Sequence, residues 1–167
     1  MPRQATVDEL FDLAIAAEKA AEELYRRLAV RFTHHPEAAD FWTKYAAEEA
    51  GHAEWLQRIR AHLSAEQLAA PADPRVLTDA HKALENSVET RLQTIGTLEA
   101  AYQLASELEH SETNAIFEFL ITHYAVAVQA ESFLRAQLKG HVGRLTNEFP
   151  ARFPDVAARL AIKALEV

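Results

Sequence analysis

The stretch that decides the fold runs from Phe41 to Leu63 and reads FWTKYAAEEAGHAEWLQRIRAHL. Residues at alternating steps of four and three along it share one face of a helix, and most of them are apolar. They are Phe41, Tyr45, Glu49, His52, Leu56, Ile59 and Leu63. Glu49 and His52 interrupt this stripe at i, i+3 spacing, which places a carboxylate and an imidazole side by side on the face expected to be buried.

A buried carboxylate destabilises the folded state unless another group compensates its charge. A metal ion is a common compensator for an inward Glu-x-x-His pair. A metal site at Glu49 and His52 would need further ligands from other segments of the chain.

The composition fits one folded domain with long helices. Hydrophobic residues make up 49% of the 167 residues, and only four glycines and six prolines are present. We expect a helical bundle over residues 1–143 and a C-terminal extension over residues 144–167. The absence of cysteine excludes disulfides, zinc–thiolate sites and iron–sulfur clusters, so any metal must use oxygen and nitrogen ligands.

Charge and hydropathy patterning exclude two classes of partner. The formal net charge of −8 and the lack of a basic stripe disfavour nucleic acid. The N-terminal segment MPRQATVDEL lacks the apolar core of a signal peptide, and no apolar run approaches the roughly 20 residues of a membrane helix. We therefore expect a cytoplasmic protein that binds no membrane.

Helix start and stop signals predict four long helices and two short ones. Thr6 and Glu9 form a capping-box pattern, and Pro36 suits the first turn of the second helix. The polar run at 110–114 is the predicted turn between the third and fourth long helices. The four long helices are expected at residues 6–34, at 36–69, from 88 to the polar run, and at 114–139. The two short helices are expected at residues 78–85 and from about residue 154. The last of these is expected to pack on the bundle or on a neighbouring subunit. This order predicts an all-α, antiparallel four-helix bundle with a long crossover between its second and third helices.

Three further carboxylates each interrupt the apolar stripe of another predicted helix: Glu18, Glu99 and Glu131. Glu18 lies sixteen residues before His34 and Glu49 fifteen after it, so the two face each other at a rise of about 1.5 Å per residue. Glu99 and Glu131 lie at the same height along the bundle only if the turn between the third and fourth long helices centres near residue 115. Tyrosines close to these faces are candidates to hydrogen-bond the carboxylates: Tyr25, Tyr45, Tyr102 and Tyr124.

The segments EKAAEELY (Glu18 to Tyr25) and EEAGHAEWL (Glu48 to Leu56) resemble the rubrerythrin-type bundles of the ferritin-like superfamily, and the likeness covers about residues 6–139. That family binds two metal ions through one Glu from each of two helices and a Glu-x-x-His from each of the other two. The resemblance implies the following metal ligands: Glu18, Glu49, His52, Glu99 and Glu131. It also implies iron, or iron with manganese, reacting with O₂ or peroxide. The chain lacks the cysteine-ligated iron domain of rubrerythrins, so electrons would come from an external donor or from Fe²⁺ itself.

The fourth predicted helix departs from the family pattern, because Leu134 stands where the second histidine is expected. A shift by one turn would align Val128 with Glu49 and Glu131 with His52, and that alignment loses a carboxylate and a histidine. Either alignment leaves the second metal position poorer in nitrogen ligands.

Other acidic residues and histidines are assigned to solvent. Glu107 or Glu109 replaces Glu99 if the third helix is shifted; otherwise both are solvated. The remaining histidines at helix ends and in loops, among them His141, are expected at the surface.

Two classes of function remain open. The first is a non-haem di-iron or iron–manganese oxidoreductase of the oxidase, peroxidase or ferroxidase type. The second is a degenerate bundle with one metal ion or none, which acts as a binding or dimerisation module. A homodimer is expected in both cases. A separate alternative explains the in-stripe carboxylates without a metal site: they are partly exposed near a bundle end, or protonated and paired with one another or with arginine.

Overall fold

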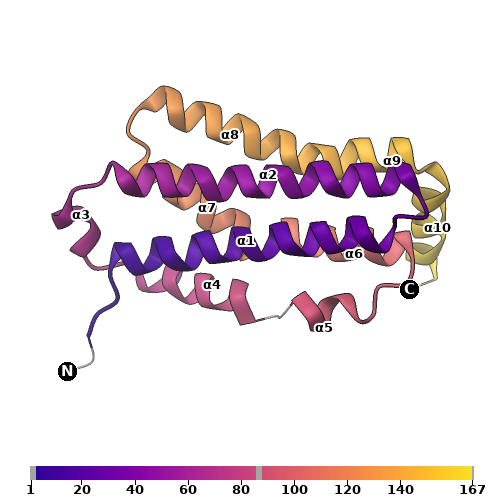
Figure 1. The fold of residues 1–167 in the computed structure, drawn as a ribbon, viewed down its shortest axis with the longest axis horizontal. Helices are drawn as coiled ribbons and strands as arrows, with labels where there is room; N and C mark the ends of the chain where they lie inside the picture. The colour runs from indigo at the N-terminus through magenta and orange to yellow at the C-terminus, as the bar shows by residue number, and fades with distance from the viewer. Residues whose placement is uncertain (1–2, 86–87, 167) are drawn as a thin grey trace.

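The computed structural model describes residues 3–85 and 88–166 of the chain, and most of these residues are helical with no strand among them. Long helices run along one axis of the molecule and short segments cross its ends and one side (Figure 1). The elements are α1 (Val7–Arg31), α2 (Pro36–Ala61), α3 (Ala65–Ala69), α4 (Pro74–Glu85), α5 (Val88–Leu92), α6 (Leu98–Glu109), α7 (Glu112–Tyr124), α8 (Val128–Gly143), η1 (Arg144–Glu148), α9 (Phe149–Arg152) and α10 (Pro154–Leu165). The prediction of an all-α chain is confirmed.

The helices α1 and α2 form an antiparallel hairpin whose ends the sequence specifies. Thr6 and Glu9 make the predicted capping box, in which the Thr6 backbone N–H donates to the Glu9 carboxylate at 2.7 Å. His35 caps α2, and Pro36 occupies its first turn. The second helix ends at Ala61 rather than at the predicted residue 69, because His62 and Leu63 turn the chain before Ser64 caps the separate helix α3.

The connection from α2 to α6 carries the chain back along the length of the molecule (Figure 1). Its first part is tied to the start of α1, where the backbone N–H of Val7 donates to the Ala70 carbonyl at 2.9 Å. The helix α4 begins at Pro74, four residues before the predicted start of the short helix, and it packs against α1 and α7. The predicted third helix is interrupted, since α5 ends at Leu92 and α6 starts only after the cap at Thr97.

The polar run at 110–114 is not the turn between the third and fourth long helices, so that prediction is wrong. The helices α6 and α7 follow one another in the same direction on either side of His110 and Ser111 (Figure 1). The hydroxyl of Ser111 accepts a hydrogen bond from the Thr113 backbone and starts α7, so the run is a break within one long helical segment. The chain reverses at residues 125–127 instead, and α8 returns along α7.

The C-terminal segment covers one end of the long helices. The π-helical turn η1 continues α8, and α9 and α10 then cross the end of the molecule, where α10 packs on α6 (Figure 1). Phe149, Phe153 and Val156 insert into the core from this segment. An ion pair between Arg159 of α10 and Glu99 of α6 also joins the two helices.

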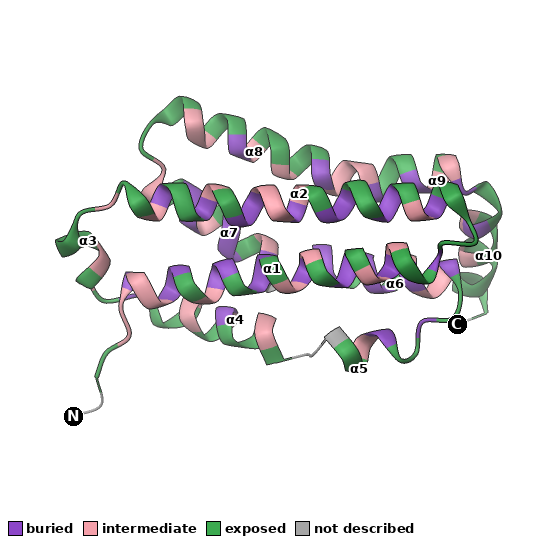
Figure 2. Ribbon diagram, in the orientation of Figure 1, coloured by how far each residue is buried: buried purple, intermediate pink, exposed green. Residues whose placement is uncertain are grey.

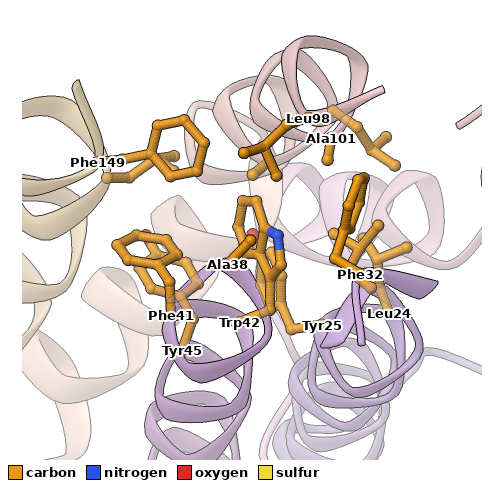
Figure 3. Close-up of a cluster of buried hydrophobic side chains, with 14 of the residues drawn as sticks. Leu24, Tyr25, Phe32, Ala38, Phe41, Trp42, Tyr45, Leu98, Ala101 and Phe149 are labelled. Atoms are coloured by element: carbon orange, nitrogen blue, oxygen red, sulfur yellow. The ribbon is translucent and has the colours of Figure 1, made fainter. Parts of the chain in front are cut away.

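The buried side chains divide into two hydrophobic clusters along the long axis, while the outer helix faces are exposed (Figure 2). One cluster lies near the α1–α2 turn and contains Trp42 stacked on Tyr25, with Phe149 closing it (Figure 3). The other contains Phe11 and Phe117 near the opposite end. Within the described part of the chain, no helix combines the length and apolar character needed to cross a lipid bilayer.

Candidate metal centre

Five ionisable side chains lie buried between the two hydrophobic clusters, and none is more than 5% exposed. They come from four helices: Glu18 from α1, Glu49 and His52 from α2, Glu109 from α6 and His141 from α8. Ionisable groups so deeply buried require mutual pairing or a bound ion.

His52 organises one half of the cluster. Its Nδ1 lies 3.0 Å from Oε2 of Glu49 and 3.6 Å from Oε2 of Glu18. The ring packs against Phe117, with 4.8 Å between the ring centroids. This half therefore combines one imidazole nitrogen with two carboxylates.

His141 organises the other half. Its Nε2 lies 3.2 Å from Oε1 of Glu49 and 3.1 Å from Oε2 of Glu109. The two oxygens of the Glu49 carboxylate thus face two different histidines. One half of the cluster contains His52 and Glu18, and the other contains His141 and Glu109. Each half also contacts one oxygen of Glu49.

A second layer of contacts fixes the orientation of these groups. Nδ1 of His141 lies 2.6 Å from Oε2 of Glu48, whose other oxygen pairs with Arg144. The ring of Tyr45 stacks on the His141 imidazole at 4.0 Å between centroids, and the Tyr45 hydroxyl donates to the His141 carbonyl at 3.1 Å. These contacts hold Nε2 of His141 toward Glu49 and Glu109.

Glu109 is held by two donors. The Tyr25 hydroxyl donates to its Oε1 at 2.6 Å, and the Asn114 side-chain amide donates to its Oε2 at 2.8 Å. Asn114 also donates to the Glu109 backbone carbonyl at 2.8 Å, which bridges the break between α6 and α7. The break at His110 and Ser111 therefore contributes directly to the position of a buried carboxylate.

Burial and mutual pairing shift the pKa values of the cluster. Burial raises the pKa of Glu18 to about 8, and the neighbouring His52 imidazole, 3.6 Å away, offsets only part of this rise. Burial lowers the pKa of His52, but the carboxylates of Glu18 and Glu49 outweigh it and raise the value to about 9. The pKa of His141 is raised to about 12 despite burial, because Glu109, Glu48 and Glu49 surround the ring. The same two histidines hold the pKa of Glu49 below its usual range, against burial.

The donor set fits a divalent transition-metal ion. Carboxylate oxygens and imidazole nitrogens are ligands for iron and manganese. One potential ligand atom each from Glu49, His52 and His141 lies within 4.8 Å of the others. Oε2 of Glu18 is buried without a hydrogen-bond partner among the described residues, and a cation would satisfy it.

The structure brings together three of the five ligand candidates predicted from the sequence: Glu18, Glu49 and His52. It does not bring Glu99 or Glu131 to this cluster. Glu99 lies at the start of α6 beside Arg159, and Glu131 pairs with Arg135 at 3.0 Å on the outer side of α8. Glu99 and Glu131 would lie at the same level only with a turn near residue 115, whereas the chain reverses at residues 125–127.

The tyrosine predictions divide in the same way. Tyr25 donates to a cluster carboxylate, and Tyr45 contacts His141 rather than a carboxylate. Tyr102 packs on Phe149 in the hydrophobic cluster, and Tyr124 packs on Phe11. Neither has a hydroxyl hydrogen bond to a cluster carboxylate within the described residues.

Glu109 and His141 were assigned differently from the sequence. The sequence offers Glu109 only as a replacement for Glu99 if the third helix is shifted. Glu109 is the residue that lies beside His141 in the structure. The prediction of His141 at the surface is wrong, since its side chain is fully buried. One signal was available, because Glu109 and His141 are 32 residues apart and Glu18 and Glu49 are 31 apart.

Comparisons with known proteins give no identification. Neither models of protein families, nor curated proteins, nor solved structures yield a match to this chain.

Proposed function

We propose that this protein is a ferritin-like four-helix bundle that binds a pair of metal ions, iron or iron with manganese, and reacts with O₂ or peroxide. The observation that carries the proposal is the position of Glu49, whose two oxygens lie within 3.2 Å of nitrogens on two different histidines. A carboxylate placed in this way can bridge two cations and offset part of their charge.

Each of the two positions has its own ligands. Glu18 and His52 would hold one ion, and Glu109 and His141 the other, with Glu49 shared between them. The set differs from two full Glu-x-x-His pairs at one place, where Leu138 precedes His141 by three residues. The second position therefore keeps its histidine and lacks one carboxylate.

The helix arrangement supports the same proposal. The segments α1, α2, α6 with α7, and α8 lie along one axis, and the connection from α2 to α6 runs the length of the molecule (Figure 1). A long crossover after the second helix is characteristic of ferritin-like bundles. All four segments contribute a ligand candidate to one level of this arrangement.

The chain's own residues would bind and orient the ions and exclude water. Tyr25 and Asn114 hold Glu109, and Glu48 holds His141. The hydrophobic clusters keep solvent away from the centre along the long axis of the molecule. When bound, an iron pair supplies electrons to dioxygen or peroxide, and a separate donor would return them.

The alternative is a metal-poor bundle that acts as a binding or dimerisation module. It is favoured by the pairing of both histidines with carboxylates at hydrogen-bond distance, which already compensates most of the buried charge without an ion. Oε2 of Glu18 weighs against this alternative, because its partner Nδ1 of His52 lies 3.6 Å away, beyond hydrogen-bond distance.

The test is the metal content of the full-length protein after anaerobic loading with Fe²⁺ and removal of unbound metal. We expect two ions per chain in the wild type, a loss of both in Glu49→Ala, and no change in Glu54→Ala. Glu54 is a matched control, because it lies on the same helix but is exposed and paired with Arg58. One ion per chain would favour a mononuclear site, and no bound ion would overturn the proposal.

A further inference from the structure

An open cleft of about 550 Å³ lies beside the candidate metal centre, between α2 and the segment formed by α8 and η1. This volume is within the range of pockets that bind small organic molecules. The cleft contacts the centre through His52, which belongs to both.

The cleft exists because two facing helices carry glycines where side chains would fill it. Gly51 of α2 and Gly140 of α8 both line it. A Cβ atom built on either glycine would have no other atom within 4 Å. Glycine at these two positions lowers helix stability relative to alanine. It also leaves the space of the cleft unfilled by a side chain.

One end of the cleft is aromatic. Trp55 of α2 and Phe133 of α8 meet edge to face there, with 5.9 Å between the ring centroids. Phe133 is 49% exposed, which is unusual for a phenylalanine and leaves its ring available for contact. An apolar or aromatic body would cover these two rings.

The other end of the cleft carries Arg144 together with the carboxylate of Glu48. Arg144 lines it and directs Nε toward Glu48 at 2.6 Å, which leaves the terminal amino groups of its guanidinium for another acceptor. The Glu48 charge is offset by both Arg144 and His141. Arginine is well suited to bind a carboxylate through two parallel hydrogen bonds.

We propose that this cleft binds a small aromatic monocarboxylate. Its carboxylate pairs with Arg144, and its ring crosses the space above Gly51 and Gly140 toward Trp55 and Phe133. The rise along α2 from Glu48 to Trp55 is about 10 Å, which matches a molecule with one ring and one acid group. The proposal deepens the proposed function, because it would place an organic acid beside the metal centre as substrate or ligand.

The experiment measures benzoate binding to the full-length protein by calorimetry and by tryptophan fluorescence, with metal removed and with metal loaded. We expect saturable binding of one benzoate per chain in both states and weaker binding of the neutral analogue benzyl alcohol. Arg144→Gln should weaken benzoate binding about tenfold and leave benzyl alcohol nearly unchanged, and Arg144→Lys should restore part of the loss.

Gly140→Leu fills the cleft and should abolish binding of both molecules. Leucine is the better helix former, so the fold is expected to survive, and thermal unfolding checks this. Gly143→Leu is the matched control, because Gly143 also lies on α8 but is not among the cleft residues, and a Cβ there would meet Asn147 only at 3.8 Å. Gly143→Leu should bind benzoate as the wild type does.

Any of these binding results would overturn the inference: no saturable benzoate binding in either metal state, binding that survives Gly140→Leu, or equal affinity for benzoate and benzyl alcohol. A dimer that Gly140→Leu dissociates would also overturn it, since a second copy of the chain would then occupy the cleft. Benzoate binding to a protein that takes up no metal would refute the proposed function alone. Metal uptake without benzoate binding would refute this inference alone.

Discussion

The carboxylate of Glu48 lies 2.6 Å from Nδ1 of His141, on the opposite side of the ring from Glu49, which lies 3.2 Å from Nε2. Two consecutive residues of α2 therefore hold the two nitrogens of one imidazole on α8. Glu48 is partly exposed and pairs with Arg144, whereas Glu49 is buried in the cluster. Glu48 thus orients the ring, and Glu49 is the carboxylate that we propose as a metal ligand beside it.

Glu48→Gln should lower metal affinity about 10- to 100-fold without removing any ligand. The amide is uncharged, so it orients His141 less strongly and no longer increases the basicity of the ring. Competition between the protein and a chelator of known affinity measures the change. Glu54→Gln, on the exposed side of the same helix, should leave affinity unchanged. Equal affinities of Glu48→Gln and the wild type would contradict this role.

The ligand assignment can be tested with two pairs of substitutions. Glu109→Gln and His141→Asn should each reduce the metal content by about one ion per chain, because both residues belong to the same half of the cluster. Glu99→Gln and Glu131→Gln should bind as much metal as the wild type, since these carboxylates pair with surface arginines instead. The reverse result would favour the register predicted from the sequence.

The first hairpin and its half of the site were predictable from the sequence. Thr6 and Pro36 mark the start of α1 and the start of α2 with strong local signals. Counting residues from the turn between these helices places Glu18 opposite Glu49, and His52 follows from helical spacing. The side chains of all three are buried together in the structure.

The second half was not predictable, because its turn carries weak local signals. Residues 125–127 are Ala, Val and Ala, and no side chain caps the start of α8. The polar residues at 110–114 give a stronger local signal, yet they only break one helical segment, and packing against α4 and α8 decides that the chain continues. Glu109 lies seventeen residues before Val126 and His141 fifteen after it, so the correct turn places them level.

Tyr25→Phe should destabilise the metal-free protein by about 1–2 kcal/mol. The substitution removes a donor 2.6 Å from the buried Glu109 carboxylate and leaves Asn114 and His141 as its partners. Urea denaturation with metal removed measures the free energy of unfolding. Tyr102→Phe is the control, because Tyr102 packs on Phe149 and its hydroxyl makes no hydrogen bond within the described residues. A similar loss in both variants would show that the loss in Tyr25→Phe does not come from the hydrogen bond to Glu109.

The stability of the metal-free protein should fall as the pH rises from about 5 to about 9. The pKa of Glu18 is raised from 4.5 to about 8 by burial, and that of His52 from 6.5 to about 9 by its carboxylate neighbours. A raised pKa in the folded state means that the folded protein binds protons more tightly than the unfolded chain. The stabilisation is complete below the unfolded pKa and is lost as the pH rises through the folded pKa. Glu49 and Glu48 have lowered pKa values, so their contributions change only below about pH 4.5 and do not oppose this trend.

Bound metal should reverse this pH dependence, because a metal ion binds the deprotonated forms of Glu18 and His52 and competes with their protons. The increase in melting temperature on adding Mn²⁺ should therefore be small at about pH 5.5 and larger at about pH 8.5. Urea denaturation in chelator and thermal unfolding in Mn²⁺ measure the two trends on the same protein. Glu18→Gln serves as the control for the metal-free series, since it removes one of the two titrating groups and should flatten the slope. If the free energy of unfolding of the metal-free protein rises from about pH 5.5 to about pH 8.5, the buried side chains do not hold protons as described. This conclusion does not depend on the metal affinity of the protein.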